Sequence, residues 1–508
     1  MNYGVCEKCK ARVPVEHVFQ DGKVYLETVC PECGRHRFMI SSNADSWQAK
    51  RDMYRYDPDA PRLLDCRLNC DTCGQNHKPK LVFIDVTNRC NLNCPICLAN
   101  VPGMGFVFDP PLSYFETILD ELATWNPKPR VELFGGEPTV RKDMFEIIGM
   151  ARDRGISVSL VTNSISLADE EYCRRVCEAK VDMLLAFDGR GAEIYQKMRG
   201  SAKAYEKKLQ ALENVRKHSR RKHTIVCTVG RGVNEHAMKD YFEFIHNYVS
   251  VTRRLFFIPL AELWESGEYE AEVMTTPADC EEILQAAFPD EPLEFVPAGL
   301  FSHLVPATRL FGKSAIRFAG VHPNCEQTTF LLSDGERYRP MSFILKRPLA
   351  EIVSDLIDRA EAVNPRLAAL DPSKALHRLW GRVLVLRAFG GLMVSSLDFK
   401  KILKGNRILR GFRLFGGMLI GRDLKEQVRR HTNVIDGVAV TILPFEELHS
   451  VESERLVQCT AAFAYVHPKT NKVATVPFCT WGLYRTEMFR KIAEKYEAEE
   501  AAQASPSR

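Results

Sequence analysis

Short apolar segments alternate with amphipathic segments between residues 81 and 259. The apolar segments are residues 81–86, 131–134, 156–161, 182–187, 224–229 and 255–259. Between them, stretches such as residues 112–125 and 235–249 carry apolar residues at the spacing of a helix. Repeated strand–helix units predict an α/β fold with a parallel barrel or open sheet. In such folds the functional site lies at the carboxyl ends of the strands.

The two ends of the chain differ in composition from this repeat. Residues 1–80 are dense in cysteine and turn residues, which predicts small modules that fold around metals. Residues 271–370 are mixed and rich in proline and acidic helical stretches. The tail from Glu497 is polar and low in apolar residues, so we expect it to be disordered.

The composition is that of a globular protein with a large core, since 45% of the 508 residues are hydrophobic and 26% are charged. No run reaches the roughly 18 to 20 consecutive apolar residues needed to cross a bilayer, and the first residues lack the apolar run of a secretion signal. We therefore expect a cytoplasmic protein. The net charge of +4 is too small, over the whole chain, to indicate a polyanionic partner.

Seventeen cysteines in a reducing compartment are better explained as metal ligands than as disulfides. Three of them follow the first predicted strand at positions i, i+4 and i+7, namely Cys90, Cys94 and Cys97. Such a loop can wrap one face of a 4Fe–4S cluster and leave one iron open to a small molecule with amino and carboxylate groups. The alternative is a zinc knuckle that lacks its fourth ligand.

Two further cysteine groups lie upstream. The first consists of two CxxC pairs with twenty residues between them, the spacing of a closed four-thiolate site for zinc or a single iron: Cys6, Cys9, Cys30 and Cys33. The second again places three thiols close together, at Cys66, Cys70 and Cys73. With His77 or a distant cysteine as fourth ligand, it predicts an auxiliary 4Fe–4S cluster, and a second zinc knuckle is the alternative.

The motifs after the next strands, FGGEP, VTNS, AFDGR and IYQKMRG, together with the cysteine loop, resemble the radical S-adenosylmethionine (SAM) superfamily. The resemblance implies a catalytic cluster on Cys90, Cys94 and Cys97, and a SAM site formed by Gly135, Gly136, Glu137, Asn163, Asp188 and Arg199. In that site the glycines approach the methionine amine and Glu137 accepts from it, Asn163 and Asp188 suit the ribose or amino group, and Arg199 pairs with the carboxylate. Taken singly, the last three fit a capped turn or a surface ion pair equally well.

The chemistry implied by this resemblance is reductive cleavage of SAM. Cleavage gives a 5'-deoxyadenosyl radical that abstracts hydrogen from unactivated carbon. An apolar, water-poor barrel interior would protect such a radical from side reactions.

Over nearly its whole length the chain also resembles the tetraether lipid synthase family, radical SAM proteins that join lipid chains by carbon–carbon bonds. The matching segments are the N-terminal cysteine module with SSNADSWQAKRD, CDTCGQNH, IDVTNRCNLNCPICLAN, FGGEPTVRKD, FDGRGAEIYQKMRG, GVNEH, MTTPAD, HPNC and PFCTWGLYR. The resemblance implies a lipid substrate, a rubredoxin-like mononuclear site, additional 4Fe–4S clusters and an electron donor such as flavodoxin or ferredoxin. It makes candidate ligands of three cysteines that otherwise suit a structural role: Cys325, Cys459 and Cys479. At residues 97–105 the chain reads CLANVPGMG, where we expect members of this family to read CFANA. A different lipid substrate or reaction outcome therefore stays open.

With these resemblances the expected fold is a partial (β/α)6 radical SAM barrel with small N-terminal cysteine-rich metal modules and a C-terminal α+β cluster-binding domain. The predicted units are a four-cysteine mononuclear metal module, an auxiliary cluster segment, the barrel, an auxiliary-cluster and lipid-access domain, and a disordered tail. Their respective bounds are residues 1–60, 61–80, 81–270, 271–496 and 497–508.

One segment is basic and apolar at once. Between Arg378 and Arg430 there are thirteen Lys and Arg against three acidic residues, and the apolar runs 384–394 and 408–421 lie among them. This pattern is typical of a helix or hairpin lying on an anionic membrane surface. We therefore expect a cytoplasmic protein that binds peripherally to the inner face of the membrane. A solvated basic helix over an ordinary core is the alternative. No aromatic RNA-binding motif is present, so we expect no nucleic-acid partner.

The sequence leaves three functions to compare. The first is a radical enzyme that forms carbon–carbon bonds between lipid alkyl chains. The second keeps the radical chemistry and changes the substrate, as in methylation of an unactivated carbon on a cofactor, or peptide modification. The third is a non-catalytic iron–sulfur binding protein, which would not cleave SAM.

Overall fold

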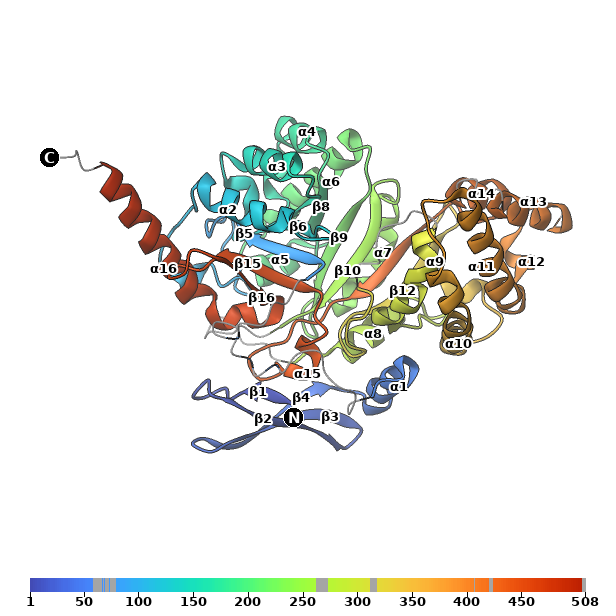
Figure 1. The fold of residues 1–508 in the computed structure, drawn as a ribbon, viewed down its shortest axis with the longest axis horizontal. Coiled ribbons are helices and arrows are strands. Elements are labelled where there is room, and N and C mark those ends of the chain that lie inside the picture. The colour runs from blue at the N-terminus through green and yellow to red at the C-terminus, as the bar shows by residue number, and fades with distance from the viewer. Residues whose placement is uncertain are drawn as a thin grey trace.

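The computed structural model describes residues 1–57, 66, 68, 73, 79–261, 273–310, 318–405, 407–419 and 424–504. Strands β5 to β10 form its centre and lie parallel to one another in chain order (Figure 1). Their bounds are Leu81–Asp85, Arg130–Phe134, Val158–Thr162, Asp182–Ala186, His223–Val229 and Thr252–Pro259. The strands are apolar and mostly buried because helices cover them, as expected for a parallel sheet. The predicted α/β fold with a partial barrel is confirmed.

The helices that follow these strands carry amphipathic sequences and bury one face each. They are α2 (Leu112–Ala123), α3 (Met144–Asp153), α4 (Glu170–Glu178), α5 (Ala192–Arg199), α6 (Ala204–His218), α7 (Met238–His246) and α8 (Pro277–Ala286). Helix α8 begins at a capping box formed by Thr276 and Asp279. The barrel strands and these helices share one continuous apolar core.

Strands from the C-terminal half extend the barrel sheet at both edges. On one side β14 (Asp436–Ile442) runs parallel to β10, and the antiparallel strands β12 (Gln327–Ser333), β11 (Val296–Pro297) and β13 (Tyr338–Pro340) follow. On the other side β15 (Ala461–Val466) runs parallel to β5, and β16 (Val473–Pro477) completes the hairpin. These strands cover edges that would otherwise expose unpaired backbone groups. The segment predicted as a separate C-terminal domain is thus partly built into the barrel.

The N-terminal residues form a small antiparallel sheet beside the barrel, at the bottom of Figure 1. Its strands are β1 (Tyr3–Val5), β2 (Arg12–Gln20), β3 (Lys23–Cys30) and β4 (Gly34–Ser41), and helix α1 (Ala44–Tyr54) follows. Buried polar contacts fasten this module to α15 (Ser453–Leu456) and the loop before it. Nε2 of His17 lies 2.8 Å from Oε2 of Glu452, and the guanidinium of Arg51 pairs with Glu454. Because Glu452 and Glu454 are already paired with side chains of the N-terminal module, we assign them to the contact between this module and the rest of the chain.

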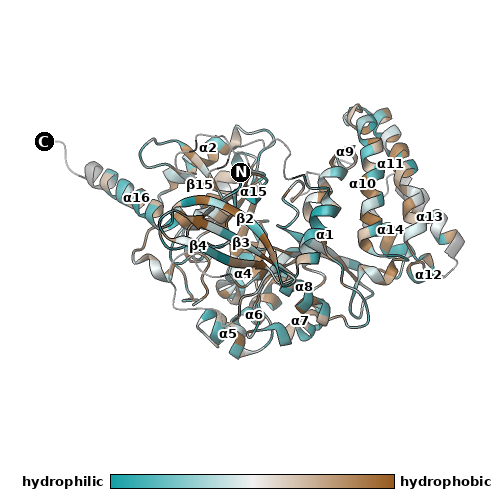
Figure 2. Ribbon diagram, turned by 90° about the horizontal axis from the view of Figure 1, so that it is seen from below, coloured by the Kyte–Doolittle hydropathy of each residue, from teal (hydrophilic) through white to brown (hydrophobic). Residues whose placement is uncertain are grey.

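A helical layer protrudes from one end of the barrel and has its own small core (Figures 1 and 2). It consists of α9 (Val305–Leu310), α10 (Leu349–Ala368), α11 (Ala375–Ser396), α12 (Phe399–Ile402), α13 (Arg407–Leu419) and α14 (Leu424–His431). By length and composition alone, α11 is apolar enough to span a membrane, although only 22% of its most apolar stretch is buried inside the protein. The sequence expectation missed this because it required an uninterrupted apolar run, and arginines interrupt α11.

The C-terminal helix α16 (Phe478–Ala504) begins inside the barrel region and projects outward at the opposite end (Figure 1). It continues through residues that we expected to be disordered from Glu497 onward. Those residues are largely Ala, Glu and Gln, which have high intrinsic helix propensity. Polarity alone predicted disorder here, whereas the high helix propensity of these residues agrees with the observed helix.

Candidate active site

Two consecutive glycines hold the cysteine loop against the second barrel strand. The backbone N–H of Gly136 donates to the carbonyl oxygen of Thr87 over 2.8 Å. A Cβ atom on Gly136 would lie 2.2 Å from the oxygen of Arg89, and one on Gly135, where φ is +138°, would lie 2.3 Å from that of Thr87. The glycines are therefore required for backbone contact with the segment that leads directly to Cys90. Their predicted approach to the amine of SAM stays a prediction.

Glu137 is completely buried, and its carboxylate is filled with hydrogen bonds from the protein. Oε1 accepts from the backbone N and Oγ1 of Thr139 (3.0 and 2.6 Å) and from Oγ1 of Thr162 (2.8 Å), and Oε2 accepts from the backbone N of Asn163 (2.6 Å). Burial raises the pKa of Glu137, and these donors lower it in part. A carboxylate has about four acceptor sites. Through these contacts Glu137 joins the ends of β6 and β7, and its predicted contact with the amine of SAM stays a prediction.

Asn163 lies directly on the cysteine loop. Its Nδ2 donates to Oδ1 of Asn91 over 2.7 Å and lies 3.6 Å from Sγ of Cys90. Its Oδ1 accepts from the backbone N of Ile165 over 3.0 Å, which fixes the orientation of the amide. Asn163 therefore reaches the first cysteine of the loop from the end of β7, and its predicted contact with SAM stays a prediction.

Asp188 and Arg199 are brought together in a buried pair. Nε of Arg199 donates to Oδ2 of Asp188 over 2.8 Å, and Nη2 donates to Oδ1 over 2.6 Å. Asp188 is completely buried, and its pKa is lowered by the nearby cations although burial alone would raise it. Arg199 thus has a bidentate partner within the protein, and its predicted pairing with the carboxylate of SAM stays a prediction. The predicted contact of Asp188 with the ribose or amino group of SAM likewise stays a prediction.

The sequence analysis missed Lys208, which lies fully buried beside this pair. Its Nζ donates to the carbonyl oxygen of Ala186 over 2.8 Å and lies 4.0 Å from Oδ2 of Asp188. Burial lowers the pKa of Lys208 to about 8, although Asp188 opposes this. Helical periodicity could have indicated that Lys208 is buried, because Lys208 lies between Ala204 and Ala211 on the apolar face of α6.

The three cysteines of the loop, Cys90, Cys94 and Cys97, are half-buried and come together at the carboxyl end of the barrel. Burial raises the pKa of Cys90 to about 12 and also raises that of Cys94. The cations of Arg199 and Lys208 partly oppose the rise at Cys94, so they favour a thiolate there. The donor set of three converging thiols beside two buried cations fits an iron–sulfur cluster.

Helix α16 fastens the cysteine loop from the other side. Nε and Nη2 of Arg485 donate to Oδ2 and Oδ1 of Asp85 over 2.9 and 2.8 Å, and Nε1 of Trp481 donates to Oδ2 over 2.9 Å. Nη1 of Arg485 also donates to the carbonyl oxygen of Ala99, two residues after Cys97. The C-terminal helix thus determines where the first strand and the end of the loop lie, a role that the sequence did not indicate.

The N-terminal module brings its four cysteines to one point at the tips of two turns. The ligand atoms of Cys6, Cys9, Cys30 and Cys33 all lie within 4.8 Å of one another. In a tetrahedral site with bonds of about 2.3 Å, sulfur atoms are about 3.8 Å apart, so this spacing fits a single ion. Burial and hydrogen bonding with Cys9 raise the pKa of Cys33 to about 12. Four thiols gathered within this distance fit a zinc or mononuclear iron centre.

The three C-terminal cysteines, which have no local partner in sequence, lie around one buried carboxylate. Sγ of Cys325 accepts from Nε of Arg455 over 3.3 Å, and Sγ of Cys479 accepts from the backbone N of Glu446 over 3.5 Å. Burial raises the pKa of all three thiols, and the charge of Glu446 raises it further. The thiols of Cys325, Cys459 and Cys479 thus each lie near the charge of Glu446, and their role as cluster ligands stays a prediction.

Only part of the 66–73 group is described. Cys66 packs against the same apolar cluster as Cys479, and Cys73 is exposed. Cys70 and His77 lie outside the described residues. The remaining described cysteines, Cys173, Cys177, Cys227 and Cys280, lie on helices α4 and α8 and on β9 and pack in or against the apolar core of the barrel.

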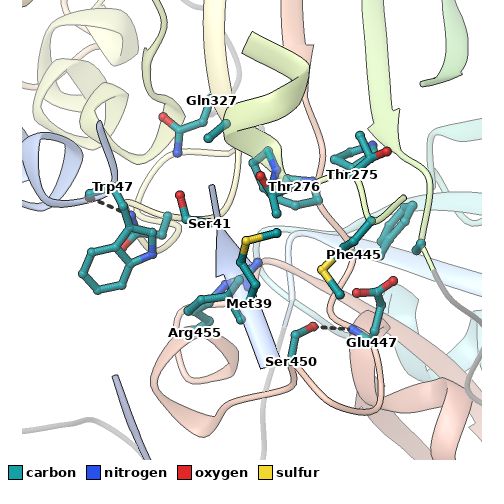
Figure 3. Close-up of a pocket in the computed structure, with 18 of the residues that line it drawn as sticks. Met39, Ser41, Trp47, Thr275, Thr276, Gln327, Phe445, Glu447, Ser450 and Arg455 are labelled. Atoms are coloured by element: carbon teal, nitrogen blue, oxygen red, sulfur yellow. Dashed lines mark hydrogen bonds between the residues drawn. The ribbon is translucent and has the colours of Figure 1, made fainter. Parts of the chain in front are cut away.

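Two cavities lie next to this arrangement. The first lies between the N-terminal module and the barrel and is lined by residues of β4, α1, the end of β10 and the loop after β14. Figure 3 shows Met39, Trp47, Thr276 and Phe445 around it. The second is small and aromatic, lined by Leu98, Phe134, Phe445, Glu446, Phe463, Phe478, Cys479, Trp481, Gly482 and Arg485. Phe445 lines both cavities, and Leu98 and Phe134 of the second adjoin the cysteine loop and the glycine turn.

Two family models match the chain. Residues 84–245 match the model described as the Radical SAM superfamily, and residues 3–42 match that of the HMPTM N-terminal zinc ribbon domain. The second match covers the four-thiol module. Together with the thiol geometry, these matches give the cofactors as a 4Fe–4S cluster and SAM, with additional metal bound by the N-terminal ribbon.

Curated proteins are similar to the chain to different extents. It is 27% identical over 505 residues to 7,8-dihydro-6-hydroxymethylpterin dimethyltransferase of Methanocaldococcus jannaschii, covering 96% of this chain and 94% of that protein. It is 33% identical over 217 residues to AdoMet-dependent heme synthase of Methanosarcina barkeri, covering 42% of this chain and 58% of that protein. Similarity to the tetraether lipid synthase family is not among these findings.

Solved structures are similar only in part. That of anSMEcpe with bound AdoMet and a peptide has a TM-score of 0.36 and 20% identity, and the match covers 49% of this chain and 72% of that chain. Streptococcus suis SuiB bound to S-adenosylmethionine has a TM-score of 0.33 and 15% identity, covering 41% and 47% of the two chains.

Proposed function

We propose that this chain, a radical SAM enzyme, methylates an unactivated carbon of a small heterocyclic substrate. The observation that carries the proposal is the similarity to the archaeal pterin dimethyltransferase over 96% of this chain and 94% of that protein. That alignment includes the N-terminal ribbon and the C-terminal strands as well as the barrel. It therefore supports a shared reaction type more strongly than a match to the barrel alone.

The residues around the three loop cysteines suit this chemistry. A 4Fe–4S cluster held by Cys90, Cys94 and Cys97 would, with SAM, supply the 5'-deoxyadenosyl radical. Gly136 and Arg485 position the two ends of the loop through backbone contacts. Arg199 favours the ionised thiol of Cys94, because its guanidinium lies nearby in a buried environment.

The aromatic residues around the second cavity offer faces on which a flat substrate ring could stack once the rings separate, since they now pack together and leave only about 30 Å3 between them. The rings of Phe445 and Phe478 are stacked with centroids 4.7 Å apart, and those of Phe463 and Trp481 are stacked at 5.5 Å. Aromatic walls bind planar heterocycles through stacking and exclude water from the radical. We assign substrate entry to the side of Phe445, since this residue lines both the larger cavity and the aromatic one.

The test is a reaction under anaerobic conditions with SAM labelled in its methyl group, a strong reductant and 7,8-dihydro-6-hydroxymethylpterin. We expect one SAM to give 5'-deoxyadenosine and methionine, and a second SAM to give its labelled methyl group to the pterin and leave as S-adenosylhomocysteine, with the reductant supplying both electrons; the 5'-deoxyadenosine and the labelled pterin should both be lost in a Cys94→Ala variant. Cleavage of SAM with no transfer of label to the pterin would refute this substrate while leaving the radical enzyme intact. The physiological electron donor is proposed to be a flavodoxin or ferredoxin, which the same assay tests by replacing the chemical reductant.

A second candidate function is carbon–carbon bond formation between lipid chains. The observation that favours it is the outward face of α11, where Leu376, Leu379, Trp380 and Val383 are 78%, 55%, 56% and 38% exposed. These positions recur at helical spacing, so they form one apolar stripe within a segment of net charge +10. Such a face suits an anionic bilayer surface, from which a lipid chain could enter.

Lipid analysis separates the two candidates. Cells that express the protein, compared with cells that express Cys94→Ala, should show unchanged lipid chains if the pterin proposal holds. New lipids lighter by two hydrogens per bond formed would instead support the second candidate, because joining two alkyl ends removes one hydrogen from each.

A further inference from the structure

Glu446 is a buried carboxylate without a well-formed hydrogen bond in the described part of the chain. It is 2% exposed, neither Oε1 nor Oε2 accepts a well-formed hydrogen bond there, and burial raises its pKa to about 8 although the nearby backbone N–H of Glu452 and the charge of Arg455 lower it in part. Its nearest cation is Nε of Arg455, 3.3 Å from Oε1 but without hydrogen-bond geometry. An unsatisfied buried carboxylate is costly, since ionised groups are normally paired or bound to metal inside proteins. The groups around Glu446 should therefore account for the burial of this carboxylate.

These surroundings are the three C-terminal cysteines. The backbone N of Glu446 donates to Sγ of Cys479, and Arg455 donates to Sγ of Cys325. Nη2 of the same arginine is also without a hydrogen-bond partner among the described residues. The donor set is thus three thiols and one carboxylate, accompanied by a cation with an unused N–H group. Such a cation can compensate for the negative charge of thiolates and of a bound cluster.

The elements that supply these groups are fixed relative to one another. Cys325 precedes β12, Glu446 follows β14, Cys459 precedes β15, and Cys479 is the second residue of α16. All three strands belong to the barrel sheet. The sheet therefore holds the segments that carry these four groups near one another.

We propose that Glu446 is an oxygen ligand of an auxiliary iron–sulfur cluster held by Cys325, Cys459 and Cys479. The inference rests on the presence of that cluster, which is part of the proposed cofactor set. Glu446 completes a coordination sphere for which the three cysteines leave one position open. Arg455 is a positioning residue that donates to the sulfur of Cys325.

The experiment uses the reconstituted full-length chain and reads out iron content and the low-temperature EPR spectrum of the reduced protein. Glu446→Gln should change the g values of one cluster and lower its occupancy, while leaving the signal of the cluster on Cys90, Cys94 and Cys97 unchanged. Glu446→Cys should retain full iron content and give a spectrum typical of four thiolate ligands, with a lower midpoint potential, because thiolate donates more electron density than carboxylate.

Glu326→Gln is the matched control. Glu326 also raises the pKa of Cys325 and Cys459, so its neutralisation changes the local charge without removing the proposed ligand. We expect its EPR spectrum to match that of the unmodified protein. Identical changes in both variants would overturn the proposal in favour of a simple charge effect.

A fourth variant separates the ligand inference from the cluster itself. Cys459→Ala should remove about four iron atoms, the content of one cluster. If it removes none, the auxiliary cluster is absent and the inference fails with it. If it removes them but Glu446→Gln leaves both spectrum and iron content unchanged, the cluster exists and Glu446 is not its ligand. If Glu446→Gln does not fold, full occupancy with altered g values in Glu446→Cys supports the proposal, and an unaltered spectrum overturns it.

Discussion

Arg199 and Asp188 form a bidentate ion pair in which the carboxylate is fully buried and the guanidinium lies next to Cys94. The pair links α5 to the end of β8, and Lys208 lies 4.0 Å from the same carboxylate. Asp188 therefore determines where a cation sits beside the cysteine loop, and its effect on the loop passes through Arg199.

The first prediction follows from this pair. Asp188→Asn should lower the free energy of unfolding by about 3 to 5 kcal/mol, because it leaves Arg199 buried without a counter-charge. Asp240→Asn is the control, since Asp240 pairs with Arg190 over 2.8 Å at a surface where both side chains are 47% exposed. Its effect should stay below about 1 kcal/mol. Equal urea unfolding curves for the two variants would contradict the structural role of the buried pair.

The second prediction concerns the glycine turn. Gly136→Ala should displace the cysteine loop, because the added Cβ would lie 2.2 Å from the carbonyl oxygen of Arg89. We expect loss of the iron bound by Cys90, Cys94 and Cys97 and loss of SAM cleavage. Gly149→Ala in α3 has no atom within 4 Å of the added Cβ and should leave both unchanged. Normal iron content in Gly136→Ala would show that the loop tolerates the displacement.

The sequence predicted the barrel well because buried parallel strands carry a local signal. Segments 81–86 and 255–259 are short, apolar and bounded by turns, and the structure has β5 and β10 there. The cysteine spacing at residues 90–97 is local in the same way. Motif order was enough to locate this loop, since its three ligands come from one short segment.

The contacts of the motif residues could not be predicted in the same way, because they depend on partners distant in sequence. A buried arginine near a SAM site has more than one possible carboxylate partner, and the pairing of Arg199 with Asp188 follows from the packing of α5 against β8. Arg485 reaches Asp85 across 400 positions of sequence. The position of Glu446 among three separate cysteines depends on the order of strands in the sheet, which hydropathy does not encode.

The third prediction concerns the metal of the N-terminal ribbon. Cys33→Ser should release one metal ion and expose the backbone of residues 3–41 to hydrogen exchange, because metal binding contributes roughly 10 to 16 kcal/mol to the folding of comparable small modules. Barrel strands should keep their protection. Cys177→Ser on the half-buried face of α4 is the control and should retain both metal and protection. Exchange that is unchanged in Cys33→Ser would mean that the ribbon folds without its ion.

The fourth prediction is a dependence of stability on pH. The pKa of Lys208 is lowered from 10.5 to about 8 in the folded protein, mainly by burial. Between these values the unfolded chain binds a proton that the folded chain does not, so the contribution of Lys208 to stability rises with pH from about 8 to 10.5 and is constant outside that window. The unfolding free energy of the unmodified protein, measured relative to Lys208→Met, should increase accordingly. A difference that does not vary with pH across this range would contradict a lowered pKa.

The fifth prediction concerns the outward face of α11. Leu376, Leu379 and Trp380 lie within one and a half turns of each other and are more than half exposed, and Arg387 continues the same face toward the C-terminus. Burial in a bilayer interface would remove this apolar surface from water at a gain of roughly 25 cal/mol per Å2, and the basic residues add attraction to anionic headgroups. The triple change to Ser at the three apolar positions should therefore abolish sedimentation with vesicles that contain phosphatidylserine.

The charge contribution to the same contact is tested by reversing basic residues. Changing Arg387, Arg407, Arg410 and Arg413 to Glu should weaken binding to anionic vesicles and leave any weak binding to neutral vesicles unchanged, since electrostatic attraction requires anionic lipid. Reversing Arg174 and Lys217, which are exposed on the far helices α4 and α6, is the control and should not alter vesicle binding. SAM cleavage without lipid should persist in all variants, because the cysteine loop lies in the barrel. If the apolar triple variant and the charge-reversed variant both bind vesicles normally, the α11 face is an ordinary solvated surface, and the lipid alternative loses the observation that favours it.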